Sequence, residues 1–218
     1  MSEATMEAVK FDPDHPENWI DCGFEQLYAM SWRDFEEVQL AALIKRFDQF
    51  RHSVAALDKL AKREGISSIA SVEDALPLLF DHRIYKSYPL SIIERRDIAK
   101  LNSWLDRLTT HDLSAMDLSG LSMIDDWLDR LDDFGMLVGT SSGTTGKLSF
   151  VPRSKVEFPT WQRSYYEAQR ATTGDNAYTD HVDTFFPGYR GGHHMMLKRL
   201  SLFNIPAAGG PEHYHTLY

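Results

Sequence analysis

A short run of small residues is the part of this sequence whose types and spacing could do chemistry. The run lies between the apolar segments 136–138 and 148–151 and reads Ser141, Ser142, Gly143, Thr144, Thr145, Gly146 and Lys147. Glycine allows a sharp turn and a close approach of the backbone to a ligand, and successive backbone N–H groups in such a turn can bind an anion. The hydroxyl groups add hydrogen-bond donors and the lysine adds a mobile positive charge. This combination suits the polyphosphate of a nucleotide.

Two common nucleotide-binding motifs do not fit this run. A Walker loop that ends at Lys147 needs a glycine where Ser141 stands and a hydroxyl residue where Leu148 stands. The G-x-G-x-x-G pattern of dinucleotide-binding folds is also missing, because Ser141 occupies the second glycine position after Gly139. A polar hairpin turn, which clusters of glycine, serine and threonine commonly form, stays open as the alternative to a phosphate loop.

The run resembles the phosphate loop of the adenylate-forming superfamily, which includes acyl-CoA synthetases, peptide-synthetase adenylation domains and luciferases. The usual pattern there is Ser/Thr-Ser-Gly-Thr-Thr-Gly-x-Pro-Lys-Gly. Residues 141–146 match it, Lys147 takes the variable position, and Leu148-Ser149 replace Pro-Lys. A lysine directly after the second glycine is similar to the phenylacetate-CoA ligase and acyl-protein synthetase branch. The departure leaves open whether Lys147 does the work of the later lysine.

Weaker similarities to the same branch lie on both sides of the loop, in segments 71–77, 185–192 and 206–210. The resemblance therefore covers roughly residues 70 to 218, and only the loop is specific. It implies an α/β fold, in which a helical N-terminal region leads into part of the N-terminal domain of an adenylate-forming enzyme, with a mixed or parallel sheet. The expected organisation is a mainly helical region at 1–135 and an α/β segment with the phosphate loop at 136–218.

The resemblance also implies a reaction, ligands and site residues. ATP, with Mg²⁺ as counter-ion, would activate a carboxylic acid as an acyl-adenylate, and the thiol of CoA or of a protein would then displace AMP. The loop 141–147 would hold the β- and γ-phosphates, and Tyr189 and His193 are candidates for the acyl pocket. No residue is assigned as catalytic.

Other elements of that superfamily are missing from the 218 residues. We find no adenine-binding aromatic-Gly-x-Thr-Glu stretch, no ribose-binding aspartate at the expected distance and no C-terminal lysine for adenylation. We therefore expect an N-terminal part of such an enzyme that is inactive alone and needs the missing C-terminal part or a partner subunit. The alternative is a non-catalytic nucleotide-binding or protein-interaction module derived from the same fold.

Composition limits the setting in which the chain works. Its net charge of −9 argues against nucleic acid as a partner, although the charge is −11 over residues 1–138 and +2 over residues 139–218. A lone cysteine, Cys22, permits no internal disulfide, which predicts a cytoplasmic protein. No apolar run is long enough to span a bilayer.

Nine histidines raise the question of a metal site, with His193-His194 and the segment 212–215 as the dense spots. In an extended segment, His213 and His215 would share one face. A zinc site needs three or four ligands, and neither cysteine pairs nor an H-E-x-x-H motif supply them here. We therefore assign no metal ligands and expect an exposed histidine tract.

Periodicity and capping residues predict the elements that must position the loop. An irregular lead-in over residues 1–30 should precede a long amphipathic helix that starts after Ser31, bends near Ser53 and ends at Gly65. Further helices are predicted after Ser71, after Ser91, over 124–135, over 161–171 and over 195–202. Strands are predicted at 136–138, 148–151, 184–186 and 205–208. Their alternation with helices predicts a parallel sheet, with the strand at 205–208 at an open edge.

Overall fold

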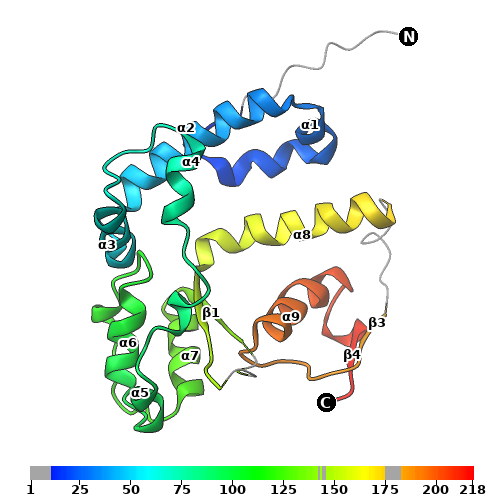
Figure 1. Cartoon of the computed structure of the whole chain (residues 1–218). Helices are drawn as coiled ribbons and strands as arrows, with labels where there is room; N and C mark the ends of the chain where they lie inside the picture. The colour runs from blue at the N-terminus through cyan, green and yellow to red at the C-terminus, as the bar shows by residue number, and fades with distance from the viewer. Residues whose placement is uncertain (1–10, 142, 144–145, 175–182) are drawn as a thin grey trace.

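A computed structural model describes residues 11–141, 143, 146–174 and 183–218, and within these residues the chain is mostly helical with two small sheets (Figure 1). The α-helices are α1 Gly23–Ala29, α2 Trp32–Phe50, α3 Ala55–Glu64, α4 Val72–Ala75, α5 Leu90–Glu94, α6 Ile98–Asp106, α7 Ile124–Asp133, α8 Phe158–Thr173 and α9 Met195–Ala207. The strands are β1 Met136–Thr140, β2 Phe150–Ser154, β3 Thr184–Phe186 and β4 Tyr214–Thr216. Short 3₁₀ turns include Pro16–Cys22, Leu76–Leu78, Ile84–Lys86 and Lys155–Glu157.

The first helices follow the predicted caps, with two differences. Ser31 caps α2 by accepting a hydrogen bond from the backbone N–H of Asp34 at 3.2 Å, and Gly65 ends α3 in the left-handed conformation with φ of +71°. The predicted single bent helix is instead two helices, because the chain turns over residues 51–54. The prediction of an irregular lead-in is wrong for residues 16–29, which form a 3₁₀ turn and α1.

The largest core joins α5, α6 and α7 to the first two strands. Trp104, Trp127 and Phe150 are buried there, and the ring of Phe150 lies 5.5 Å from that of Trp127 and 6.2 Å from that of Trp104. Asn102 is the buried polar member: its amide nitrogen donates to the carbonyl of Leu113 at 2.9 Å, and its amide oxygen accepts from the indole N–H of Trp127 at 3.0 Å. Both polar ends of Asn102 are thus satisfied inside the core.

Both sheets have two strands, and they differ in direction. β1 and β2 pair antiparallel, with Met136 opposite Ser154 and Thr140 opposite Phe150. The prediction of a parallel sheet is therefore wrong for the strands that flank the loop. β3 does pair in parallel, across the intervening helix α9, but its partner β4 was not among the predicted strands. The predicted strand at 205–208 is wrong, because α9 continues to Ala207.

Helix α8 connects the two ends of the described chain, as it runs between the α1–α2 pair and α9 in Figure 1. On one side the guanidinium of Arg163 pairs with Asp21, and the hydroxyl of Thr160 donates to the carbonyl of Glu17 at 3.3 Å. On the other side the buried Phe203 of α9 packs on Trp161, with ring centroids 4.7 Å apart. The first residues of the described chain are therefore fixed against the last third of the sequence.

Candidate functional site

The glycine- and hydroxyl-rich run connects the last residue of β1, Thr140, to the first residue of β2, Phe150. Of its predicted site residues, the structure describes Ser141, Gly143, Gly146 and Lys147. The predictions for Ser142, Thr144 and Thr145 lie outside the described residues. Because β1 and β2 are antiparallel, the run joins neighbouring strands and lies at the end of this hairpin.

The two glycines have backbone conformations that favour glycine. Gly143 has φ of +68° and Gly146 has φ of +84°, both in the left-handed region. The N–H of Gly146 donates to the carbonyl of Gly143 at 2.7 Å. A Cβ built at Gly143 would lie 3.0 Å from the side chain of Leu148, whereas one at Gly146 would meet no atom within 4 Å. Both the φ angle and the available space therefore restrict residue 143.

Ser141 closes the base of the run against the following strand. Its backbone N–H donates to the carbonyl of Ser149 at 3.2 Å, and its hydroxyl accepts a hydrogen bond from the N–H of Ser149 at 2.9 Å. These two bonds extend the pairing of β1 and β2 by one step. They also occupy the backbone donor of Ser141.

Lys147 is held by Tyr88, a residue from the helical region. Its ammonium donates a hydrogen bond to the backbone carbonyl of Tyr88 and lies 4.3 Å from the centroid of the Tyr88 ring. Such a position over an aromatic face is favourable for a cation. Burial lowers the pKa of Lys147 from its ordinary value, because leaving water disfavours the charged form.

Tyr88 also holds the residue after Lys147. Its phenol donates to the carbonyl of Leu148 at 2.8 Å, while its ring packs on Trp104 at 5.0 Å and on Phe150 at 5.5 Å. Burial raises the pKa of the Tyr88 phenol to about 12. The sequence contains no signal for this role, because Tyr88 precedes its two partners by 59 and 60 residues.

The structure brings His193 to the start of the same run. The carbonyl of His193 accepts hydrogen bonds from both the backbone N–H and the hydroxyl of Thr140, each at 2.9 Å. The imidazole Nε2 lies 3.2 Å from a carboxylate oxygen of Asp129 on α7. The other ring nitrogen, Nδ1, is buried and has no hydrogen-bond partner among the described residues. The predicted acyl-pocket residue His193 thus lies beside the residue that precedes Ser141.

Tyr189, the other predicted acyl-pocket residue, lies in different surroundings. Its side chain is exposed, and its ring packs on that of Tyr218 with centroids 5.1 Å apart. The neighbouring Arg190 donates from its guanidinium to the carbonyl of Pro211 at 2.6 Å. Tyr189 is therefore positioned by the C-terminal residues of the described chain, whereas His193 is positioned by β1 and α7.

His213 and His215, near the C-terminus, both contact the carboxylate of Asp183. A single oxygen of Asp183 lies 3.0 Å from Nδ1 of His213 and 3.2 Å from Nε2 of His215. These hydrogen bonds lower the pKa of Asp183 from its ordinary value. Within residues 11–141, 143, 146–174 and 183–218, no group of three or more His, Cys, Asp or Glu side chains could hold a metal ion.

The arrangement around the loop allows a test of its fit to a polyphosphate. The backbone N–H groups of Ser141 and Gly146 and the ammonium of Lys147 donate to oxygens of the protein itself. The N–H of Gly143 has no hydrogen bond to another described residue. The described part of the loop carries hydroxyl oxygen but no carboxylate, so Mg²⁺ would be bound mainly through the phosphates of a nucleotide. The loop can offer Lys147 to a phosphate only once that side chain leaves Tyr88.

No helix in the described part of the chain combines the length and the apolar character that a bilayer crossing requires. Comparison of the chain with protein-family models, with curated proteins and with solved structures found no match.

Proposed function

We propose that this chain provides the phosphate-binding part of an enzyme that uses ATP to activate a carboxylic acid. In that reaction the carboxylate attacks ATP to form an acyl-adenylate and pyrophosphate, and a thiol of CoA or of a protein then takes the acyl group and releases AMP. The protein acts chiefly by positioning the phosphates and by stabilising their charge.

The observation that carries the proposal is the backbone of the loop. Gly143 and Gly146 both adopt positive φ in a run that also contains four hydroxyl residues and ends at Lys147. A backbone bent in this way can direct N–H groups toward an anion, and the open space beside Gly146 leaves room for a ligand to approach. His193 supports the same site, because its carbonyl is bonded to Thr140 at the start of the loop.

The contact between Lys147 and Tyr88 favours a second candidate function. A lysine whose ammonium already donates to a carbonyl and lies over a ring can serve to fix the hairpin instead of binding phosphate. In this case the chain is a non-catalytic module, and its partner binds elsewhere. The acidic helix α7, which has five aspartates between Asp125 and Asp133, is the surface we then expect to contact a basic partner.

Nucleotide binding distinguishes the two candidates. Isothermal titration with Mg-ATP should show saturable binding to the parent chain, and the double variant Lys147→Ala with Thr144→Ala should bind at least about tenfold more weakly, because charge-assisted contacts to phosphate are lost. Lys59→Ala removes an exposed lysine on α3 and is the matched control, which should bind as the parent does.

The folding of each variant is checked by circular dichroism, so that a loss of binding is not confused with a loss of structure. The absence of saturable Mg-ATP binding by the folded parent would contradict the phosphate-binding proposal and favour the non-catalytic module. Equal binding by the parent and the folded double variant would show that ATP does not bind at this loop.

A further inference from the structure

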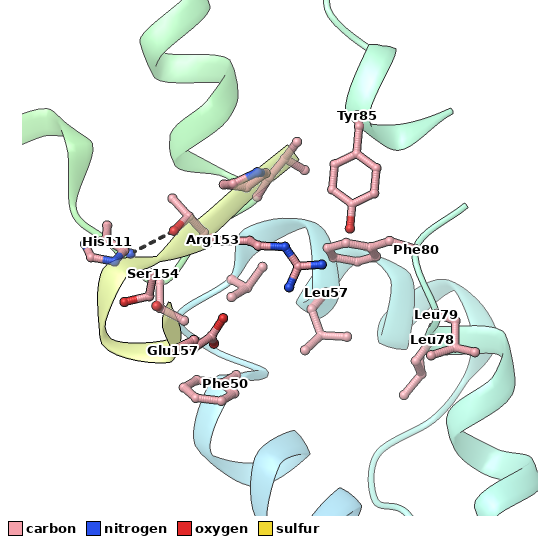
Figure 2. A pocket seen from close by; sticks show the side chains of 15 residues that line it. Phe50, Leu57, Leu78, Leu79, Phe80, Tyr85, His111, Arg153, Ser154 and Glu157 are labelled. Atoms are coloured by element: carbon pink, nitrogen blue, oxygen red, sulfur yellow. Dashed lines mark hydrogen bonds between the residues drawn. The ribbon is translucent and has the colours of Figure 1, made fainter. Parts of the chain in front are cut away.

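A large cavity lies at the end of β2 that is away from the loop, between this strand and the N-terminal helices. One compartment, of about 680 Å³, has a mostly apolar wall that includes Leu57, Phe80, Tyr85 and Leu108 (Figure 2). A second compartment, of about 820 Å³, extends toward Arg46 and the helix α8 residues Thr160 and Trp161. We call the two together the Arg153 cavity, because Arg153 lines both.

The two compartments adjoin each other. Phe50, His111, Arg153 and Glu157 are among the residues that line both of them. Volumes of a few hundred to about 1,000 Å³, with a mostly apolar wall and a few polar groups, are typical of sites for small molecules. None of the described residues of the loop 141–147 lines either compartment. The Arg153 cavity is therefore separate from the loop, and an inference about it does not depend on the proposed function.

The charges in the Arg153 cavity indicate what it could bind. Arg46 and Glu17 neutralise each other, since a guanidinium nitrogen lies 2.9 Å from a carboxylate oxygen. Arg153 and Glu157 are both exposed, and no ion pair joins either of them to another residue that the structure describes. The guanidinium of Arg153 is positioned by the ring of Trp161, whose centroid lies 4.9 Å away. One positive and one negative group thus remain for a ligand.

Figure 2 shows how these two groups lie. The guanidinium of Arg153 extends from β2 toward Phe80 and Tyr85, and Glu157 lies beside Phe50 in the 3₁₀ turn Lys155–Glu157 that precedes α8. The proximity of Arg153 to Tyr85 also acts on the tyrosine, whose pKa is raised by burial and partly lowered by the positive charge. Both charged groups therefore border the apolar compartment.

We propose that the Arg153 cavity binds a large hydrophobic amino acid as a zwitterion. Its carboxylate would bind the guanidinium of Arg153, a planar group that matches carboxylates. Its ammonium would bind the carboxylate of Glu157, and its side chain would enter the apolar compartment beside Leu57 and Phe80. A ligand with only one of the two charges would contact either Arg153 or Glu157 but not both.

The test compares ligands that differ by one charge at a time. Isothermal titration of the whole chain with L-phenylalanine and L-leucine should give saturable binding of at least one of them. 3-Phenylpropionate lacks the ammonium and phenethylamine lacks the carboxylate, so each should bind at least about tenfold more weakly than L-phenylalanine if the latter is the ligand, as expected for the loss of a charge-assisted hydrogen bond. For L-leucine, 4-methylpentanoate and isopentylamine are the corresponding probes.

Two variants locate the binding. Arg153→Gln should weaken the binding of the amino acid about tenfold or more and leave the binding of the amine unchanged. Glu157→Gln should also weaken the binding of the amino acid about tenfold or more, but it should leave the binding of the carboxylic acid unchanged. Arg33→Gln, an exposed arginine near the start of α2, is the control that should bind as the parent does. Arg153→Lys keeps the positive charge and tests the site if Arg153→Gln does not fold.

The proposal is overturned if neither amino acid binds saturably below about 10 mM. It is also overturned if either the acid or the amine analogue binds as tightly as the amino acid. The same holds if the folded Arg153 and Glu157 variants bind the amino acid as tightly as the parent does. Mg-ATP binding is measured on the same samples, so failure at the Arg153 cavity is read separately from failure at the loop.

Discussion

Removal of one hydroxyl group tests how the helical region holds the loop. The variant Tyr88→Phe keeps the buried ring that packs on Trp104 and Phe150 but loses the hydrogen bond from the phenol to the carbonyl of Leu148. The half-buried carbonyl then lacks this donor. Loss of one partner of a buried hydrogen bond costs about 1–3 kcal/mol. We therefore expect the free energy of unfolding to fall by about that amount at pH 7.

The pH dependence gives an independent check of the same contact. Burial raises the pKa of the Tyr88 phenol to about 12, so above pH 10 the unfolded chain loses this proton before the folded one does. The hydroxyl's contribution to stability is therefore complete below pH 10 and is lost as the pH rises through 12. The phenol pKa is about 10 in the unfolded chain and about 12 in the folded one. At pH 11 linkage therefore reduces the difference in free energy of unfolding between the parent and Tyr88→Phe by about 1.4 kcal/mol.

The measurement is urea denaturation of both proteins between pH 7 and pH 11, with tryptophan fluorescence and circular dichroism as the signals that monitor unfolding. Equal slopes of the free energy against urea concentration would show that the variant unfolds from a similarly compact state. Tyr218→Phe, at an exposed position, is the matched control and should leave stability nearly unchanged. Equal stability of Tyr88→Phe and the parent at pH 7, with no change in their difference up to pH 11, would refute the reasoning.

Three further variants test the surrounding fold. Asn102→Leu leaves the buried indole N–H of Trp127 and the carbonyl of Leu113 without their partner, and we expect urea denaturation to show a loss of about 2–4 kcal/mol; a loss too small to measure would contradict the network. Backbone N–H groups hold the pKa of the Asp74 carboxyl below its usual range, so its contribution to stability is lost as the pH falls below about 4; Asp74→Asn should make melting temperatures less dependent on pH there, and an unchanged dependence would count against the capping box. Gly65→Ala places a side chain at φ of +71° and should cost about 1 kcal/mol in thermal unfolding, whereas unchanged stability would argue against the left-handed cap.

Local signals in the sequence predicted many of the elements. Ser31, Ser71 and Gly65 act through their immediate neighbours, as helix caps do, and the structure confirms all three. The strand at 184–186 is also confirmed at its predicted bounds. The prediction for 205–208 was wrong because the buried ring of Phe203 packs on α8, and this contact favours continuation of α9 over the local preference for a strand.

The contacts of the loop could not be predicted from the sequence, although the direction of its flanking strands could have been. The residues between β1 and β2 are too few for a crossover helix, which favours the polar hairpin turn that the sequence left open as an alternative. Tyr88 and His193 contact the hairpin from distant parts of the chain, and no spacing rule connects them. The residue types of the loop were evident from the sequence, whereas the hydrogen bond and ring contact between Lys147 and Tyr88 depend on tertiary packing.

The hold of Tyr88 on Lys147 has a consequence for any anion that recruits this lysine. The ammonium would have to leave a carbonyl and a ring that already stabilise it, so the measured affinity would be weaker than the intrinsic one by the fraction of molecules in which Lys147 is released. Departure of the lysine would in turn remove one of the two hydrogen bonds that join Tyr88 to residues 147–148. Binding of an anion at the hairpin would then change the contacts of Tyr88 with the helical region, some 60 residues earlier in the chain.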